Sequence, residues 1–190
     1  MGEKIPSEEI KKIEISILDY IASVCEENNI GYYLAYGTLL GAIRHHGFIP
    51  WDDDIDIYML REDYMKFIEI AKEHIHHRYK LLSIYNDDDY YYEFAKVVDS
   101  NTKLKINNVK QIKKEGVWVD IFPLDNVPKH VFFLKILINF LVVCRILSVY
   151  IKFPHEKRNI ILYPLWAISK CIGPRFFLKM TEKLVAKKKK

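Results

Sequence analysis

Two aspartates, Asp54 and Asp56, flank Ile55 at the start of an apolar segment, and this spacing is suited to binding a divalent cation. Because side chains alternate between the two faces of a strand, both carboxylates are expected on one face, with Ile55 and Ile57 on the other. Two carboxylates held close together repel each other and raise one pKa unless a cation neutralises them. We therefore predict that Asp54 and Asp56 bind a metal ion.

A third carboxylate is expected from Asp120, which stands between Val119 and Ile121 in an otherwise apolar segment. An acid in such a strand is costly unless it is paired or metal-bound, and a buried salt bridge is the alternative interpretation. Mg²⁺ or Mn²⁺ takes oxygen ligands and shares its remaining positions with substrate phosphates. The three acids together therefore predict a metal-dependent phosphate site.

Asp52 and Asp53 precede the predicted strand, where they are expected to orient the loop or a water molecule. Asp53 is also a candidate catalytic base for an attacking hydroxyl, although nothing in the sequence selects it among the acids. A solvated acidic loop is the alternative interpretation of the run from Asp52 to Asp56. Such a loop, however, would have no reason to bury alternate residues.

Gly37 and Thr38 lie between a predicted strand and a predicted helix, a position suited to holding phosphate. Glycine permits close backbone approach, and free amides at the start of a helix attract anions. A turn in which Thr38 caps the helix would have the same sequence. The acidic run follows within one helix and one loop, so we expect both to meet at the same end of adjacent strands.

Three further side chains are candidates for phosphate or nucleotide binding. Arg44 closes the predicted short helix and Lys96 lies in a predicted strand, so each could hold a phosphate, with surface ion pairing as the alternative. Trp51 could stack on a base or on choline. Packing of the loop against the core is the alternative for Trp51.

The elements that must position these residues alternate between helix and strand early in the chain and run strand after strand later. Apolar residues from Ile10 to Cys25 recur at helical spacing, so we predict a helix with Ser7 as N-cap that ends at Asn28 to Gly31. The other predicted helices cover 38–46 and 62–76, and the predicted strands cover 32–36, 54–60, 80–85, 91–98, 103–109 and 117–122. This order predicts an α+β fold with a mixed sheet and helices packed on one face.

The charge is divided unevenly along the 190 residues. Residues 1–125 hold 15 Lys/Arg and 23 Asp/Glu, a net of −8, whereas residues 126–190 hold 14 and 2, a net of +12, which together give the +4 of the whole chain. We predict a catalytic domain over 1–128 and a basic, apolar helical region over 129–190. Such asymmetry favours contact with an anionic surface, for which we expect a membrane and no nucleic acid.

The segment 131–151 is a long apolar run that polar residues interrupt too often for a confident membrane span. A helical projection places two polar clusters on it. The first is Lys135 and Asn139, and the second is Arg145, Ser148 and Lys152. The segment 160–180 repeats the mixture of aromatic and basic residues before the terminal Lys187 to Lys190. A helical cap with a solubilising lysine end is the alternative to membrane binding.

The three cysteines and the N-terminus indicate the compartment. Cys25, Cys144 and Cys171 are far apart and odd in number, which argues against a disulfide framework and a zinc site. The first residues have no apolar export segment, and Pro6 stands where a myristoylation signal needs Ser or Thr. We expect a cytoplasmic protein, with the inner face of the plasma membrane as the candidate surface for its basic region.

The runs 37–44, 47–56 and 119–125 closely resemble the LicD family, which includes the fukutin-related proteins. The resemblance implies a nucleotidyltransferase-like fold. It also implies transfer of a phospho-alcohol, typically phosphocholine from CDP-choline, onto a cell-surface glycan or its lipid-linked precursor. By residue match, Gly37 and Thr38 correspond to the phosphate-binding turn, Asp54 and Asp56 to the metal pair, and Asp120 to the third metal ligand.

Two other functions fit part of the pattern. A nucleotide-sugar glycosyltransferase could use Asp54 and Asp56 as a DxD metal motif, although such enzymes generally place the acids after a longer nucleotide-binding domain. A non-catalytic metal-binding scaffold would need the acids but not Gly37 and Thr38. Consumption of CDP-choline, CDP-ribitol or a UDP-sugar distinguishes these functions from phospho-alcohol transfer.

Overall fold

The computed structural model describes residues 4–73, 76–126, 131–153 and 161–185. The chain divides into two compact units. The sheet unit is formed by residues 1–86, 94–104 and 114–124, and the helical unit by residues 87–93, 105–113 and 125–190. The predicted boundary at residue 128 lies outside the described residues and stays a prediction. The predicted α+β class is confirmed by a five-stranded mixed sheet that combines with helices.

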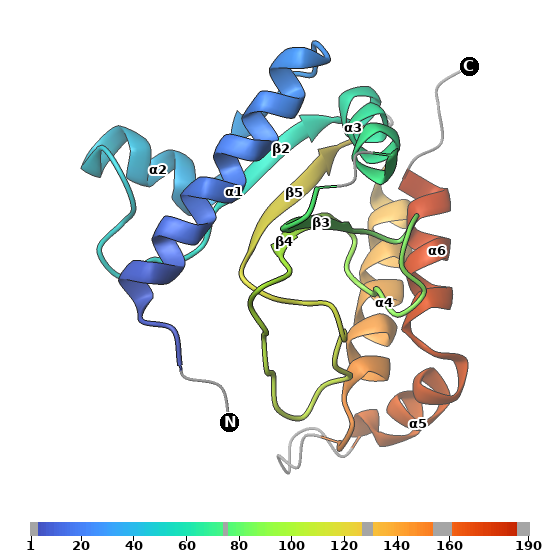
Figure 1. Cartoon of the computed structure of the whole chain (residues 1–190). Coiled ribbons are helices and arrows are strands. Elements are labelled where there is room, and N and C mark those ends of the chain that lie inside the picture. The colour runs from blue at the N-terminus through green and yellow to red at the C-terminus, as the bar shows by residue number, and fades with distance from the viewer. Residues whose placement is uncertain (1–3, 74–75, 127–130, 154–160, 186–190) are drawn as a thin grey trace. The chain divides into compact units, whose positions relative to one another are not determined.

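The sheet has the strand order β1-β2-β5-β4-β3 (Figure 1). Its strands are β1 (Tyr33–Leu34), β2 (Asp56–Leu60), β3 (Tyr79–Leu82), β4 (Ala95–Asp99) and β5 (Trp118–Leu124). β2 and β5 run parallel, whereas the other neighbouring pairs are antiparallel. The central parallel pair brings together two segments that lie some sixty residues apart, because Asp56 is paired with Asp120.

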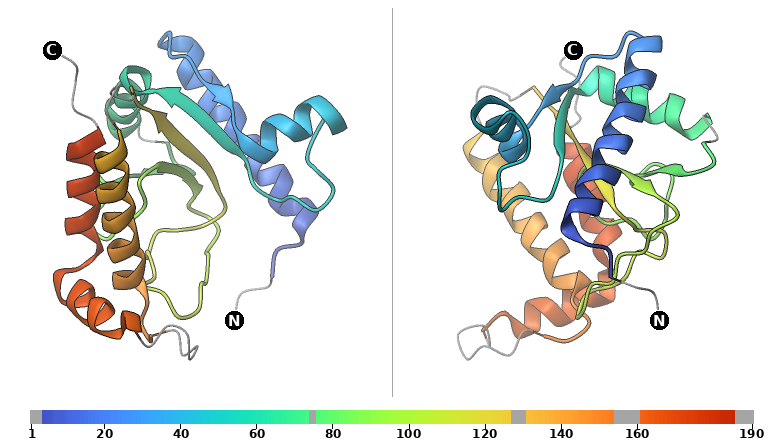
Figure 2. Two further views of the ribbon diagram at one scale, coloured as in Figure 1. Left: turned by 180° about the vertical axis from the view of Figure 1, so that it is seen from behind. Right: turned by 60° about the vertical axis from the view of Figure 1, so that its left-hand side comes forward.

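The helices of the sheet unit are α1 (Ser7–Glu27), α2 (Tyr36–His45) and α3 (Arg61–Glu73). One face of the sheet forms the main core, where Ile57 and Ile121 are fully buried with Ile17 of α1 and Phe67 of α3. Figure 2 shows α1 lying along this part of the sheet. Burial of large aliphatic and aromatic side chains of this kind contributes about 1.5–3 kcal/mol each.

The opposite face of the sheet carries the polar and aromatic side chains. Along β2, exposure alternates between half-buried Asp56 and Tyr58 and fully buried Ile57 and Met59. In β5, the fully buried Ile121 marks the core side, so its neighbours Asp120 and Phe122 lie on the other side. This second face positions the candidate site.

Several element boundaries differ from those predicted. Pro6, and not Ser7, is the N-cap of α1. The helix after β1 begins at Tyr36, two residues earlier than predicted, and Tyr36 has a left-handed φ of 42°. Strand β3 ends at Leu82 because the Asn86 side chain closes a turn, in which its Oδ1 accepts a 2.8 Å hydrogen bond from the Ser83 amide.

The predicted strand over 103–109 was wrong. Its β-branched residues lack a neighbouring strand along their length, and pairing is limited to an isolated bridge between Val109 and Tyr150. The Leu104 amide instead donates to the Glu115 carbonyl at 2.9 Å. The high strand propensity of residues 103–109 is therefore overridden by hydrogen bonds that hold the segment as a loop.

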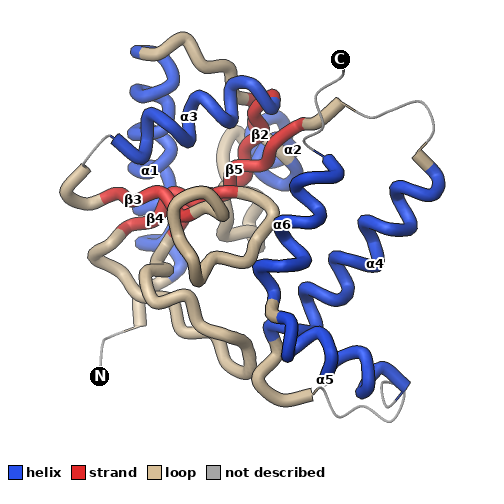
Figure 3. Tube along the Cα trace, turned by 90° about the vertical axis from the view of Figure 1, so that its right-hand side faces the viewer, coloured by secondary structure: helices blue, strands red, loops and turns tan. Residues whose placement is uncertain are grey.

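The helical unit contains α4 (Phe132–Val149), α5 (Tyr163–Ile172) and α6 (Pro174–Val185), and α4 contacts both other helices (Figure 3). Leu141 and Cys144 of α4 pack with Phe177 of α6. Arg145 is buried, pairs with Glu93 at 2.7 Å and donates to the Tyr91 carbonyl at 2.9 Å. The basic segment 187–190 lies outside the described residues.

The exposure of α4 agrees with the prediction for one polar cluster, because Lys135 and Asn139 are exposed, and differs for the other. Arg145 and Ser148, which were expected in a polar surface cluster, are both buried. Large apolar residues are exposed instead, among them Phe133 at 83% and Phe140 at 52%. By length and composition α4 could cross a membrane, and a third of its 18 residues are buried in the structure. The polar residues that interrupt the apolar run all lie within the continuous helix α4.

Candidate functional site

Three charged side chains from adjacent strands form a row across the polar face of the sheet. Asp56 of β2 is paired in register with Asp120 of β5, and Asp120 is paired with Lys96 of β4. Residues paired in register lie on the same face. Lys96 Nζ is 3.0 Å from Asp120 Oδ1. We call Asp56, Asp120 and Lys96 the charged row.

Lys96 lies inside this site, and its side chain is only 4% exposed. Its Nζ is 3.7 Å from Glu115 Oε1 and 3.9 Å from the centre of the Trp118 ring. The buried salt bridge that was the alternative interpretation of Asp120 is therefore present. Lys96 neutralises part of the acidic charge of the row.

The aspartates before β2 share the electrostatic field of the charged row. Asp54 was predicted to lie within this strand. The strand begins at Asp56, so Asp54 instead lies in the segment that leads into it. Burial, followed by the charge of Asp52, raises the pKa of Asp54. Burial, followed by the charges of Asp54 and Asp120, raises the pKa of Asp56 to about 7. Asp53 is exposed to solvent.

The start of α2 is joined directly to these acids. Thr38 Oγ1 accepts a 2.8 Å hydrogen bond from the Asp56 amide, so this hydroxyl fixes the beginning of β2 and does not cap the helix. A Cβ atom on Gly37 would collide with the Asp52 carboxylate. A side chain at position 37 would therefore displace the Asp52 carboxylate, and the role of Gly37 in phosphate binding stays a prediction.

Two of the predicted site residues, Arg44 and Trp51, are exposed to solvent. Arg44 is exposed in the last turn of α2, seven residues beyond Gly37, which corresponds to about 10 Å along the helix. Trp51 is 84% exposed, so it does not pack the loop onto the core. Both side chains are accessible to a ligand, but the structure does not place them in the charged row.

Glu14 of α1 is a buried acid that sequence reasoning missed. It is only 2% exposed, and its Oε2 has no hydrogen-bond partner among the described residues. Burial, followed by the charges of Asp54 and Asp53, raises the pKa of Glu14 to about 9. The signal was an acid at the position between Ile10 and Ile17 where the apolar stripe of the helix requires a core residue.

The acids fit a cation by charge but do not form a ready-made cage. In the described parts of the chain, no three His, Cys, Asp or Glu side chains are already grouped as metal ligands. Several acids nevertheless crowd the same region, and burial raises the pKa of Asp54, Asp56 and Asp120 together. A divalent cation that shares its coordination with substrate phosphates would relieve this repulsion.

Glu14 should make the metal-free protein less stable as the pH rises. Its carboxyl is protonated in the folded state up to about pH 9, whereas an unfolded Glu loses its proton near 4.5. The stabilisation that protonation provides is therefore complete below pH 4.5 and is lost between pH 4.5 and 9. With EDTA present, we expect Glu14→Gln to flatten the fall in unfolding free energy between pH 5 and 8, by up to about 1 kcal/mol per pH unit.

Urea denaturation at a series of pH values measures this effect. Glu9→Gln, at an exposed position of the same helix, is the matched control and should follow the wild type. Parallel pH profiles for the wild type and Glu14→Gln would contradict the assignment of a buried, protonated Glu14.

Comparison with known proteins adds the following findings. The family model described as LicD/FKTN/FKRP, nucleotidyltransferase domain, matches residues 29–139. The lipopolysaccharide cholinephosphotransferase LicD of Haemophilus influenzae is 40% identical over 131 residues, which is 67% of this chain and 48% of that protein. An uncharacterized protein of Rickettsia prowazekii is 30% identical over 68% of this chain and 48% of its own length.

A shorter similarity links the chain to mammalian proteins. Human ribitol 5-phosphate transferase FKRP is 46% identical over 44 residues, which is 23% of this chain and 9% of that protein. The chain thus spans about half the length of the two bacterial relatives and a small part of the mammalian one. The family match includes the charged row, Asp54 and the start of α2.

Proposed function

Because the chain belongs to the LicD/FKTN/FKRP nucleotidyltransferase family, we propose that it transfers a phospho-alcohol group from a CDP-activated donor to a glycan. Phosphocholine from CDP-choline is the donor group that we favour, because a relative that is 40% identical over 67% of this chain is a lipopolysaccharide cholinephosphotransferase. The observation that carries the proposal is the charged row, with Asp54 and the start of α2 beside it, inside the matched segment.

Asp54, Asp56 and Asp120 are the residues that would hold Mg²⁺ or Mn²⁺. When bound, the cation would neutralise the diphosphate of the donor and the charge that develops on the leaving nucleotide. Lys96, held at 3.0 Å from Asp120, adds a fixed positive charge to the same region. Thr38 keeps the first residue of β2 in place through its hydrogen bond to the Asp56 amide.

The proposed reaction exchanges the phosphoanhydride bond of the donor for a new phosphate ester bond. An acceptor hydroxyl attacks the β-phosphorus of the donor, a new oxygen–phosphorus bond forms, and the bond to CMP breaks. Asp53, exposed before β2, is the proposed acceptor of the hydroxyl proton. Positioning and charge stabilisation supply most of the catalysis in phosphoryl transfer, so the protein needs few reacting groups of its own.

A donor comparison tests the proposal. The protein is incubated with Mg²⁺, lipopolysaccharide as the glycan acceptor, and CDP-choline, CDP-ribitol or UDP-glucose, and nucleotide release is followed by chromatography. We expect CMP from a CDP-alcohol and no UDP. Release of UDP alone would favour a glycosyltransferase, and no release from any donor would favour a non-catalytic scaffold.

We further propose that the helical unit binds an anionic membrane surface that carries a lipid-linked acceptor. The support is the exposure pattern of α4, which buries Arg145 and exposes Phe133 and Phe140. Lys135 and Lys152, near the two ends of this helix, are exposed and complement anionic headgroups. Exposed aromatic residues beside lysines are typical of proteins that bind at the membrane interface.

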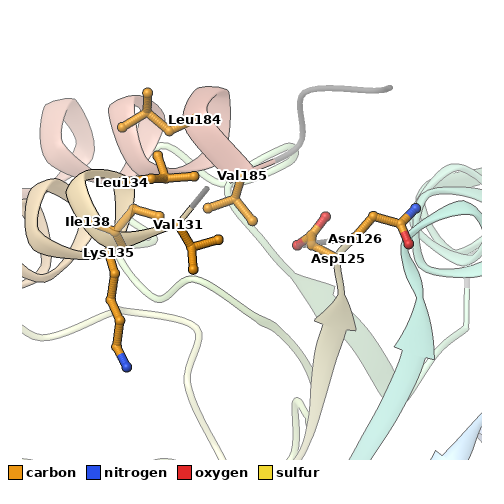
Figure 4. A pocket seen from close by; sticks show the side chains of 8 residues that line it. All are labelled: Asp125, Asn126, Val131, Leu134, Lys135, Ile138, Leu184 and Val185. Atoms are coloured by element: carbon orange, nitrogen blue, oxygen red, sulfur yellow. The ribbon is translucent and has the colours of Figure 1, made fainter. Parts of the chain in front are cut away.

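An apolar pocket of about 310 Å³ lies in the same unit, between the first turns of α4 and the end of α6 (Figure 4). Leu134 and Ile138 of α4 and Leu184 of α6 provide much of its lining, and Lys135 lies at its side. Such a pocket is suited to apolar chains. It therefore adds apolar surface to the region that we propose contacts lipid.

Liposome flotation tests the membrane proposal. The wild type should float with vesicles that contain phosphatidylglycerol, and binding should weaken as salt increases because the lysines are screened. Phe133→Ser should reduce partitioning by roughly tenfold, since a buried Phe contributes about 1.5–3 kcal/mol. Ile15→Ser, an exposed apolar position of α1, is the control. Equal flotation of both variants, or none by the wild type at any salt, would contradict the proposal.

A further inference from the structure

A set of aromatic rings lies directly beside the charged row on the same face of the sheet. Tyr58 and Phe122 are paired in register, each two residues after an acid of the charged row. The ring centre of Phe94, two residues before Lys96, is 4.4 Å from that of Phe122. Tyr36 completes the set, with ring centres 5.1 Å from Tyr58 and 5.4 Å from Phe122. We call these four residues the aromatic row.

The rings of the aromatic row are steeply inclined to one another and are not buried. The planes of Tyr36 and Phe122 meet at 83°, and those of Tyr58 and Phe122 at 63°. The Tyr36 side chain is 60% exposed, and Tyr58, Phe94 and Phe122 are partly exposed. Several ring faces and edges are therefore accessible to one small ligand group.

The backbone of Tyr36 supports a functional role for this ring. Its φ of 42° is a left-handed conformation that bulky residues rarely adopt. Backbone strain of this kind persists only where the surrounding structure fixes it, and it is concentrated at functional sites. This strained backbone holds the Tyr36 ring against Tyr58 and Phe122. Because Tyr36 is largely exposed, burial of its side chain does not explain why the strained conformation is kept.

We propose that the aromatic row binds the quaternary ammonium group of the donor while the charged row faces its phosphates, an inference that rests on the proposed function. The faces of aromatic rings attract such cations, which cannot form hydrogen bonds. The two rows are two residues apart along each strand, about 6.6 Å. In phosphocholine the ammonium lies two carbons beyond the ester oxygen, so one molecule can reach both rows.

The aromatic faces distinguish between the candidate donor alcohols. The nearby positive charge, Lys96 Nζ at 5.4 Å from the centre of the Phe94 ring, is balanced by its contacts with Asp120 and Glu115. A ribitol chain, which is neutral and polar, would gain little from the aromatic faces. The inference therefore favours choline over ribitol as the donor alcohol.

The test compares Mg²⁺-dependent binding of three nucleotides by calorimetry. They are CDP-choline, its 3,3-dimethylbutyl analogue in which carbon replaces the ammonium nitrogen, and CMP. We expect the wild type to bind CDP-choline roughly 5- to 30-fold more tightly than the neutral analogue. Tyr58→Leu should remove most of this preference without changing CMP affinity, and Tyr58→Phe should retain it. Tyr79→Leu, which removes a stacked tyrosine from β3 at the far edge of the sheet, controls for loss of stability.

The outcomes separate this inference from the function on which it rests. If the wild type binds CDP-choline without any preference over the neutral analogue, the inference is overturned while the proposed donor stands. Equal weakening of CMP and CDP-choline in Tyr58→Leu would assign the rings to the cytosine and also overturn it. If the wild type binds no CDP-choline at all, the proposed donor itself fails.

Discussion

Replacement of Asp54 by Asn is expected to lower the rate of phospho-alcohol transfer at least about 10³-fold while the protein remains folded. Asp54 lies in the approach to β2, and burial together with the charge of Asp52 raises its pKa. Loss of one carboxylate would weaken the cation where the diphosphate must be held. The substitution also removes a repulsive charge, so the metal-free variant should be at least as stable as the wild type.

Initial rates of CMP release from CDP-choline, measured with Mg²⁺ and a glycan acceptor, check this prediction, and thermal denaturation in EDTA checks the accompanying stability. Asp19→Asn, on the exposed side of α1, is the matched control and should keep wild-type turnover. A folded Asp54→Asn protein with normal turnover would show that Asp54 has no role in cation binding.

Replacement of Lys96 by Met is expected to lower the free energy of unfolding by about 3 kcal/mol. The Lys96 side chain is 4% exposed and pairs with Asp120 and, at longer distance, with Glu115. Its removal leaves two buried carboxyls without their cation, and burial already raises the pKa of both. A similar change at an exposed ion pair costs at most about 1 kcal/mol.

Urea denaturation at pH 7 measures the difference, with Lys72→Met as the exposed control, because Lys72 pairs with Glu69 on α3. Adding Asp120→Asn to Lys96→Met should restore part of the lost stability, since the unpaired acid is then removed. Equal losses for Lys96→Met and Lys72→Met would contradict a buried charge pair in the charged row.

The parts of the site that depend on short-range pattern could be predicted from the sequence. The alternation around Asp56 and Asp120 placed both acids on strands, and the register of β2 with β5 confirms that they lie side by side. The mixed sheet followed from the order of helices and strands. These features depend on period and composition, which the sequence states directly.

The features that depend on pairing between distant segments could not be predicted. Nothing in the sequence around Lys96 indicates that β4 would place it against Asp120. The same holds for the aromatic row, because Tyr58 and Phe122 become neighbours only through the register of the parallel pair. Strand register is set by the whole sheet and its core, and a single strand does not contain it.

The predicted exposure of Arg145 and Ser148 in α4 was wrong for a related reason. Arg145 and Ser148 were expected on the surface because charged and hydroxyl side chains usually are. In the structure, Arg145 pairs with Glu93 from a loop about fifty residues earlier in the chain, and this ion pair offsets the free-energy cost of burying the guanidinium. The acid at Glu14 was likewise hidden in an apolar stripe. Both are polar residues at core positions, where local pattern and tertiary contacts disagree.

The most direct test of phospho-alcohol transfer is ³¹P NMR of CDP-choline incubated with the protein, Mg²⁺ and a glycan acceptor. We expect that the diphosphate signals decrease while CMP appears, that EDTA stops the reaction, and that Asp54→Asn leaves the donor intact. An unchanged CDP-choline spectrum with the wild type, together with consumption of UDP-glucose under the same conditions, would contradict phospho-alcohol transfer at this site.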